Sequence, residues 1–117
     1  AAFSGHVEAV ALLLDRGANL EAKDEGGSTA LVRAAFEGHK DMVELLLDRG
    51  ADLEAKSRSD STALALAASG GHKGAVKVLL DRGANMEAKD RLGSTALVAA
   101  ASGGHADTVK LLLDRGA

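Results

Sequence analysis

Residues 28–51 read STALVRAAFEGHKDMVELLLDRGA, and this stretch decides the fold. Thr29 stands at a capping position before a run of good helix formers, which predicts a short helix that stops at Gly38. A second helix is predicted over residues 40–47, because its apolar residues fall on one face. Gly50 can adopt the left-handed backbone that commonly closes a helix. The stretch therefore predicts two short helices joined by a tight turn.

The same pattern recurs at a constant interval of 33 residues along the chain of 117 residues. Two of the recurring motifs are Gly-His, beginning at Gly5, Gly38, Gly71 and Gly104, and Leu-Leu-Asp-Arg-Gly-Ala, beginning at Leu13, Leu46, Leu79 and Leu112. Motifs that recur in phase indicate modules that bury their apolar faces against neighbouring copies. The sequence predicts one domain, a linear stack of units at 1–23, 24–56, 57–89 and 90–117. The first unit begins inside its own first helix, and the last lacks a trailing hairpin.

Helix, turn, helix and hairpin at this period resemble ankyrin repeats, and the resemblance covers the whole chain. It rests on Asp-x-x-Gly-x-Thr beginning at Asp24, on Leu-x-x-Ala-Ala beginning at Leu31, and on the two motifs given above. The resemblance implies an all-α solenoid of stacked helix-turn-helix units with inter-repeat hairpin loops. It also implies protein binding and an intracellular location, cytoplasmic or nuclear.

The chain departs from the ankyrin pattern in ways that bear on stability rather than on fold. The family's Pro after the capping Thr, and its His two positions later, are replaced by Ala30 and Val32, Ala63 and Ala65, and Ala96 and Val98. These changes remove a preset backbone angle and an imidazole hydrogen bonder. In the third unit Ser57 and Asp60 replace the Asp and Gly of the hairpin. Asp60 then occupies a tip that needs a positive φ, so a distorted hairpin is expected.

Composition and charge exclude several classes of protein. The chain is 46% hydrophobic and 26% charged, which is typical of a globular protein. No apolar run approaches the roughly 20 residues of a membrane-spanning helix, and no secretory signal is visible. Cysteine is absent, which excludes disulfides and the usual structural zinc sites. A net charge of −3 argues against a nucleic-acid or membrane-surface binder.

Residues that could carry chemistry favour structural roles. Equivalent histidines in neighbouring units are expected about 8–10 Å apart, whereas one zinc ion holds its ligands at about 2 Å. His39 with Asp41, and His105 with Asp107, have no nucleophile at a matching position. Residues 69–71, Ser-Gly-Gly, lack the Gly-Lys-Ser/Thr that follows in a phosphate loop. We therefore expect no enzyme activity, no metal and no cofactor.

Charged residues also recur once per unit. The Asp-Arg pairs at 15–16, 48–49, 81–82 and 114–115 are expected to be solvated near helix ends, where Arg suits the helix dipole. Glu21, Glu54 and Glu87 each precede a Lys by two residues, so both charges should lie on one side of an extended segment and offset one another. Residues 24–56 hold eight acids and four bases (−4), and residues 57–89 hold three acids and five bases (+2).

Positions that differ between units are the candidates for recognition, because packing constrains the shared ones. The resemblance implies that the end of the first helix and the hairpin tips line a concave groove. The predicted partner-binding residues are Phe3, Glu25, Arg33, Phe36, Glu37, Arg58, Ser59, Ser69, Arg91 and Leu92. The only two aromatic residues, Phe3 and Phe36, share one repeat position and either form an exposed stacked anchor or fill gaps between helices.

Three functions compete. The leading one is a module that binds a protein partner of unknown identity. The second is a scaffold segment of a longer repeat array, which associates end to end through outward residues such as Val109, Leu112 and Leu113, because end units usually carry polar outer faces. The third is the targeting region of a larger enzyme.

Overall fold

The computed structural model describes residues 2–17, 19, 21, 23 and 27–116, and the side chains of these from Glu8 onward. This part of the chain forms seven helices: α1 (Ala2–Asp15), α2 (Ala30–Glu37), α3 (Lys40–Asp48), α4 (Ala63–Ser69), α5 (Lys73–Asp81), α6 (Ala96–Ser102) and α7 (Ala106–Asp114). A single antiparallel bridge, between Lys56 and Thr62, is the strand-like pairing found within the described ranges. The predicted all-α repeat fold is confirmed.

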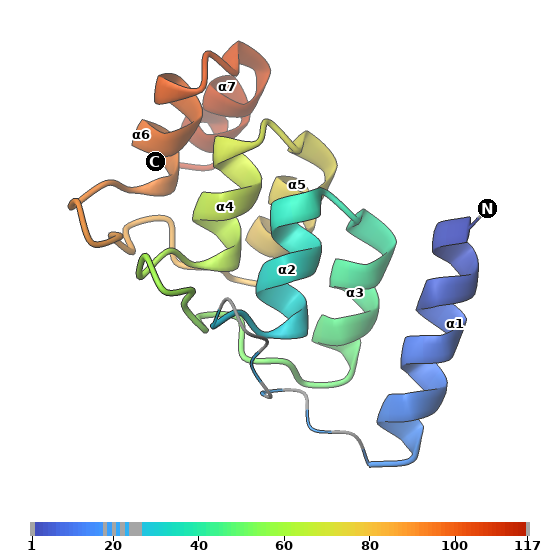
Figure 1. Cartoon of the computed structure of the whole chain (residues 1–117). Coiled ribbons are helices and arrows are strands. Elements are labelled where there is room, and N and C mark those ends of the chain that lie inside the picture. The colour runs from blue at the N-terminus through green and yellow to red at the C-terminus, as the bar shows by residue number, and fades with distance from the viewer. Residues whose placement is uncertain (1, 18, 20, 22, 24–26, 117) are drawn as a thin grey trace.

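The helices form two layers that run along the stack. The first helices of the units, α2, α4 and α6, lie side by side in one layer, and α1, α3, α5 and α7 form the other (Figure 1). Each helix from α2 to α7 packs on its partner within the unit and on the equivalent helices of adjacent units, and α1 packs on α3. The stack measures 39 by 28 by 22 Å along its principal axes. Figure 1 also shows hairpin loops that project from one edge of the layers.

The caps that begin and end the short helices follow the sequence closely. Thr29, Thr62 and Thr95 each accept a hydrogen bond from the backbone N–H three residues on, over 3.3, 3.3 and 3.4 Å. This contact satisfies one of the N–H groups that a helix leaves unpaired at its start. In the turn after the first helix, Gly38 has a φ of 78°, a conformation that Gly adopts without the steric cost of a Cβ atom. The predicted capping positions are confirmed.

Leucine, valine and alanine fill one continuous core between the layers. The largest buried side chains are Leu31, Leu46, Leu64, Leu79, Leu112, Val32, Val43, Val76 and Thr108. Most recur 33 residues apart, so each unit buries the same positions against the next. Leu112 is completely buried, so the prediction that it faces outward with Leu113 was wrong. Neighbouring residues of a helix point in different directions, so Leu113 points to the outer face while Leu112 points to the core.

The first unit does not form the expected helix-turn-helix. Helix α1 runs without a break from Ala2 to Asp15 and passes through Gly5-His6, where the other units turn. The residues before Gly5 are therefore helical in continuity with those after it. These residues instead extend the second helix of the unit.

The hairpin of the third unit is regular, so the expectation of a distorted hairpin was wrong. Asp60 has a φ of 59°, and the equivalent Gly93 has a φ of 81°. Both hairpins close with the same backbone bonds: Ser57 N to Ser61 O spans 2.9 Å, and Asp90 N to Ser94 O spans 3.0 Å. Asp tolerates the left-handed region better than most side chains, which explains the preserved shape.

The Asp and Arg residues of the recurring Asp-Arg pairs form ion pairs between successive units. Arg49 pairs with Asp15, Arg82 pairs with Asp48, and Arg115 lies 2.8 Å from Asp81. Each of these pairs links the ends of two neighbouring second helices. They form a ladder of ion pairs between units, while the Asp side chains stay 53–59% exposed, so the predicted solvation is confirmed and the pairing with the neighbouring unit is the addition.

Two of the recurring glutamates also bind the next unit. Glu21 accepts a hydrogen bond from the backbone N–H of Asp52 over 2.9 Å, and Glu54 accepts one from Asn85 over 3.0 Å. Lys56 donates to the carbonyl of Lys89 over 3.3 Å. Both side chains therefore bridge neighbouring hairpins, and the mutual compensation of their charges stays a prediction.

Two histidines have the structural role that their spacing favours. Nε2 of His72 lies 3.1 Å from the carbonyl oxygen of Phe36, and Nε2 of His105 lies 2.9 Å from that of Ser69. Both contacts reach back to the end of the first helix of the preceding unit. The histidines thus satisfy carbonyl groups that a helix leaves unpaired at its C-terminus.

Candidate protein-binding groove

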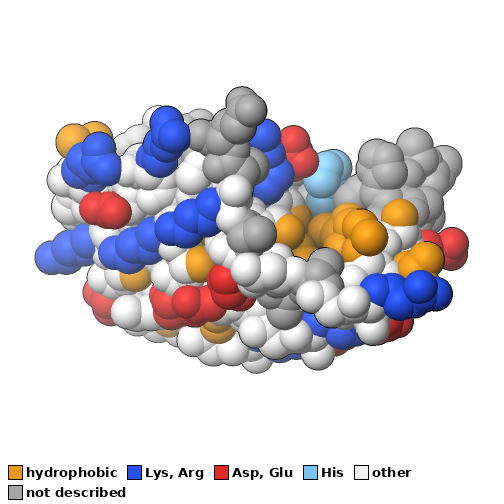
Figure 2. Space-filling model, turned by 60° about the horizontal axis from the view of Figure 1, so that its bottom comes forward, with side chains coloured by type: hydrophobic (Ala, Val, Ile, Leu, Met, Phe, Trp, Pro, Cys, Tyr) orange, Lys and Arg blue, Asp and Glu red, His pale blue; other side chains and the backbone are white. Residues whose placement is uncertain are grey.

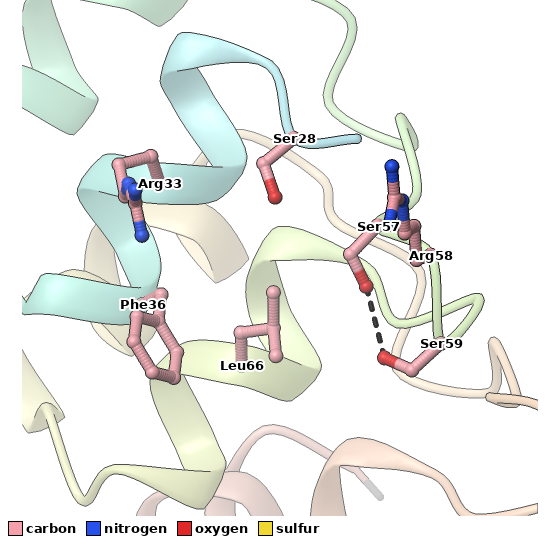
Figure 3. Close-up of a pocket in the computed structure, with 7 residues that line it drawn as sticks. All are labelled: Ser28, Arg33, Phe36, Ser57, Arg58, Ser59 and Leu66. Carbon is pink, nitrogen blue, oxygen red and sulfur yellow. Dashed lines mark hydrogen bonds between the residues drawn. The ribbon is translucent and has the colours of Figure 1, made fainter. Parts of the chain in front are cut away.

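A groove of about 330 Å³ lies between α2, α4 and the hairpin that precedes α4. We call it the Phe36 groove; its lining residues are Ser28, Arg33, Phe36, Ser57, Arg58, Ser59 and Leu66 (Figure 3). Four of these, namely Arg33, Phe36, Arg58 and Ser59, are residues predicted for partner binding. The fold therefore brings residues of two units to one concave surface.

Phe36 and Leu66 form the apolar part of the Phe36 groove. Phe36 stands in the last turn of α2 with 55% of its surface exposed. The alternative prediction, that this ring fills a gap between helices, was therefore wrong. Leu66 lies on α4 and is half-buried. Figure 3 shows Arg33 on α2 to one side of these two side chains and the hairpin of Arg58 on the other. The apolar surface is therefore bordered by two guanidinium groups.

The hairpin wall is built from hydroxyl groups and one long cationic side chain. The Oγ atoms of Ser57 and Ser61 each lie 3.0 Å from Oγ of Ser59. The stem of Arg58 lies across Gly27 of the preceding hairpin, where a Cβ atom would stand only 2.7 Å from Cγ of Arg58. The missing side chain at Gly27 therefore makes room for Arg58 at the edge of the groove.

Arg91 and Leu92, on the next hairpin, do not line the Phe36 groove. The backbone N–H of Arg91 donates to the carbonyl of Ser59 over 3.0 Å, and its guanidinium donates to the carbonyl of Arg58. These bonds tie the two hairpins together. Leu92 stands at the tip with 89% of its surface exposed. Arg91 thus supports the wall of the groove from behind, and Leu92 projects beyond it.

The remaining predicted residues lie elsewhere. Glu37 lines a separate crevice beside α1, and its carboxylate lies 3.4 Å from Nε2 of His39. Ser69 is exposed at the end of α4, where its carbonyl is held by His105. The side chain of Phe3, and all of Glu25, fall outside the described residues, so the predicted Phe3–Phe36 stack and the Glu25 tip stay predictions.

Charged side chains are unevenly distributed over the face of the stack that carries the hairpin loops, which we call the hairpin face. Figure 2 shows Lys and Arg side chains gathered over the left half of this face, with acidic side chains below them, and a hydrophobic patch beside a histidine towards the right. The exposed cations of the last two hairpins are Lys56, Arg58, Lys89 and Arg91. The same two hairpins also expose the acids Asp52, Glu54, Asp60 and Glu87, so a partner that approaches this half of the face meets cations and acids side by side.

The groove residues suit binding better than chemistry. Among the seven lining residues there is no histidine or carboxylate that could act as a base for the serines. Within the described ranges, no group of three or more His, Cys, Asp or Glu side chains could hold a metal ion. The described helices also include none that is long and apolar enough to cross a membrane.

Sequence reasoning missed Ser28, Ser57 and Leu66 as lining residues. A signal for Leu66 was present, because it occupies the repeat position of Arg33 and Ala99, and this position changes in every unit. Ser28 recurs as Ser61 and Ser94, so variation between units could not reveal it. Its place in the groove follows only from the packing of α2 beside the next hairpin.

Comparison with known families agrees with the repeat architecture. A family model of ankyrin repeats, built of three copies, matches residues 1–57 and again residues 55–117. These two matches together cover the chain from end to end. Among curated proteins, none matches the chain significantly.

Proposed function

Because the chain belongs to the ankyrin-repeat family, whose repeats are generally protein–protein interaction modules, we propose that it binds a protein partner in the Phe36 groove. The observation that carries this proposal is the exposed ring of Phe36 beside Leu66, with Arg33 and Arg58 at the two edges. Ankyrin repeats are typically non-enzymatic, and the lining residues of the groove agree with a role in binding.

The lining of the groove favours one kind of partner segment. An apolar side chain can bury itself against Phe36 and Leu66, and aromatic rings commonly anchor interfaces of this kind. A neighbouring carboxylate can pair with Arg33 or Arg58, because guanidinium groups bind carboxylates through two parallel hydrogen bonds. The proposed ligand is therefore a protein segment with an acidic residue close to an apolar one.

Selection of binding peptides from a random library displayed on phage tests this function. The selected peptides should combine an acidic with an apolar residue, and calorimetry should show that Phe36→Ala and Arg58→Glu each weaken their binding by about tenfold or more. Matched controls are Leu13→Ala, at a leucine 59% exposed on α1, and Lys77→Glu, at an exposed cation on α5. Far-UV circular dichroism checks that all four variants keep their helices. Peptides that bind both groove variants as tightly as the parent chain would show that the groove is not the binding site.

A further inference from the structure

The polar side chains that line the Phe36 groove are all able to donate hydrogen bonds. They are Ser28, Arg33, Ser57, Arg58 and Ser59 (Figure 3). A guanidinium group has donors only, and a hydroxyl group donates to any acceptor that lacks a proton of its own. Among the described residues that line the groove, none carries a carboxylate. The lining therefore suits a ligand group that is negatively charged and only accepts hydrogen bonds.

The wall of the groove lacks a carboxylate because of Ser57. This serine occupies the repeat position of Asp24 and Asp90. In the fourth unit, Oδ1 of Asp90 accepts from the backbone N–H groups of Leu92 and Ser94 over 2.8 and 2.9 Å. A serine at this position has no carboxylate to offer to the equivalent N–H groups. The exchange of Asp for Ser therefore removes both an internal acceptor and a negative charge from the wall of the groove.

The hairpin of the third unit is left with donors that have no internal acceptor. The N–H groups of Ser59 and Ser61 are equivalent to the two that Asp90 binds, and neither has an acceptor among the described residues. The hydroxyls of Ser57, Ser59 and Ser61 are joined by two hydrogen bonds, so one O–H of the three is left to donate elsewhere. Donors of this kind gain most from a charged acceptor. This wall of the groove therefore suits a bound anion.

The number of donors favours a phosphoryl group over a carboxylate. A phosphoryl group on a side chain carries about two negative charges and three acceptor oxygens, which is more than a carboxylate offers. Guanidinium groups bind phosphate oxygens through parallel hydrogen bonds, and Arg33 and Arg58 border the groove on two sides (Figure 3). The exposed Asp60 lies at the tip of the same hairpin but is not a lining residue.

We propose that the Phe36 groove recognises a phosphorylated side chain of its protein partner. This inference rests on the proposed function and narrows it, because the acidic residue of the partner becomes a phosphorylated one. The phosphoryl group pairs with Arg33 and Arg58 and accepts hydrogen bonds from Ser57 and Ser59, while an apolar residue of the partner packs on Phe36. Phosphorylation of the partner then controls whether the two proteins bind.

Titration of the full chain with phenyl phosphate, followed through the backbone amide signals in NMR spectra, tests the site without a peptide. The signals of Ser57, Arg58 and Ser59 should shift and reach saturation. Benzoate, which carries a carboxylate on the same ring, should bind about tenfold more weakly. Inorganic phosphate should shift the same signals but bind more weakly than phenyl phosphate, because it leaves Phe36 uncovered. If phenyl phosphate shifts none of these signals, the proposal is overturned, whatever the peptide selection shows.

Phosphopeptides test the inference on the partner side. In peptides selected as described above, phosphoserine replaces the acidic residue, and calorimetry should show binding about tenfold tighter than that of the glutamate form. Equal affinities of the two forms would overturn the inference and leave the proposed function intact. If neither form binds, the proposed function fails, and the inference fails with it, because the phosphoryl group would then have no protein partner to belong to.

Ser57→Asp tests whether the missing carboxylate creates the site. The variant restores the residue that closes the hairpin of the fourth unit, so the fold should be kept. Its carboxylate should bind the hairpin's own N–H groups, repel the phosphoryl group and weaken phosphopeptide binding by about tenfold or more. The matched control Ser102→Asp makes the same change of charge at the exposed end of α6, outside the groove, and should leave the affinity unchanged. A preference for the phosphopeptide that survives Ser57→Asp would place the phosphoryl group elsewhere and overturn the proposal.

Discussion

The imidazole ring of His72 lies so close to Gly38 of the preceding unit that a Cβ atom on Gly38 would stand 2.4 Å from Nδ1. The ring also meets the carbonyl of Phe36 over 3.1 Å, so one side chain both fills the turn and caps the helix before it. The close contact requires a residue without a side chain at position 38. The units are therefore held in register by the pairing of a glycine with a histidine.

Replacement of Gly38 by alanine should lower the free energy of unfolding by about 2–4 kcal/mol. An alanine at position 38 must keep the left-handed backbone, which costs roughly 1 kcal/mol. Its Cβ atom also overlaps the ring of His72, which costs about 1–3 kcal/mol. The matched control is Gly104→Ala, where φ is also positive (75°) but the space is open, so only about 1 kcal/mol should be lost. Urea denaturation measures both. Equal losses at the two positions would exclude the contact with His72 as the cause.

Asp60→Gly should raise stability by roughly 0.5 kcal/mol. Its φ of 59° costs a side chain about 1–2 kcal/mol, and glycine avoids this cost but loses about 0.5–1 kcal/mol through the greater entropy of its unfolded chain. Asp60→Ala keeps a Cβ atom without the local hydrogen bonds of Asp and should be less stable than the parent. Urea midpoints of the three proteins should therefore rank glycine, aspartate, alanine, and any other order contradicts the argument.

Glu54→Ala should cost about 1 kcal/mol, because the backbone N–H of Asn85 loses its carboxylate acceptor. Glu87 occupies the same repeat position, and no N–H of the described residues donates to it, so Glu87→Ala should be nearly neutral. Thermal unfolding of both variants at the same ionic strength makes the comparison. A matching loss in Glu87→Ala would show that the effect comes from net charge rather than from the hydrogen bond.

Thr62→Ala should destabilise the start of α4 by about 1 kcal/mol, because the N–H of Ala65 loses the hydroxyl acceptor that lies 3.3 Å away. Thr62→Ser keeps that hydroxyl and serves as the control. Amide hydrogen exchange should be faster at Ala65 in the alanine variant and close to the parent rate in the serine variant. Unchanged exchange in both variants would mean that the cap does not protect this amide.

The elements of each unit could be predicted from the sequence because their determinants are local. Thr29 caps the N–H of Val32 only three residues away, and the glycines that end the helices stand next to the turns they make. Helix α1 was the exception. The sequence pattern marks a turn at Gly5-His6, whereas the helix continues through it from Ala2 to Asp15.

The contacts between units could not be predicted in the same way. Arg49 follows Asp48 directly in the sequence but pairs with Asp15, because the register between two packed helices decides which charges meet. The same holds for the Phe36 groove. Ser28 enters it only because α2 packs beside the next hairpin, in a register that the motifs do not encode. Repetition reveals that neighbouring units pack together, and only the packed structure reveals which atoms meet.

The polar contacts that join neighbouring units have a consequence for how such a protein changes in length. The separation is 31 residues from Glu54 to Asn85, 33 from Lys56 to Lys89 and 36 from Phe36 to His72, so each contact involves one neighbour only. Deletion or duplication of 33 residues in the gene therefore gives every new neighbour the same set of partners. Recombination can lengthen or shorten the stack in whole units, and each step moves the Phe36 groove by one helix spacing relative to the chain ends.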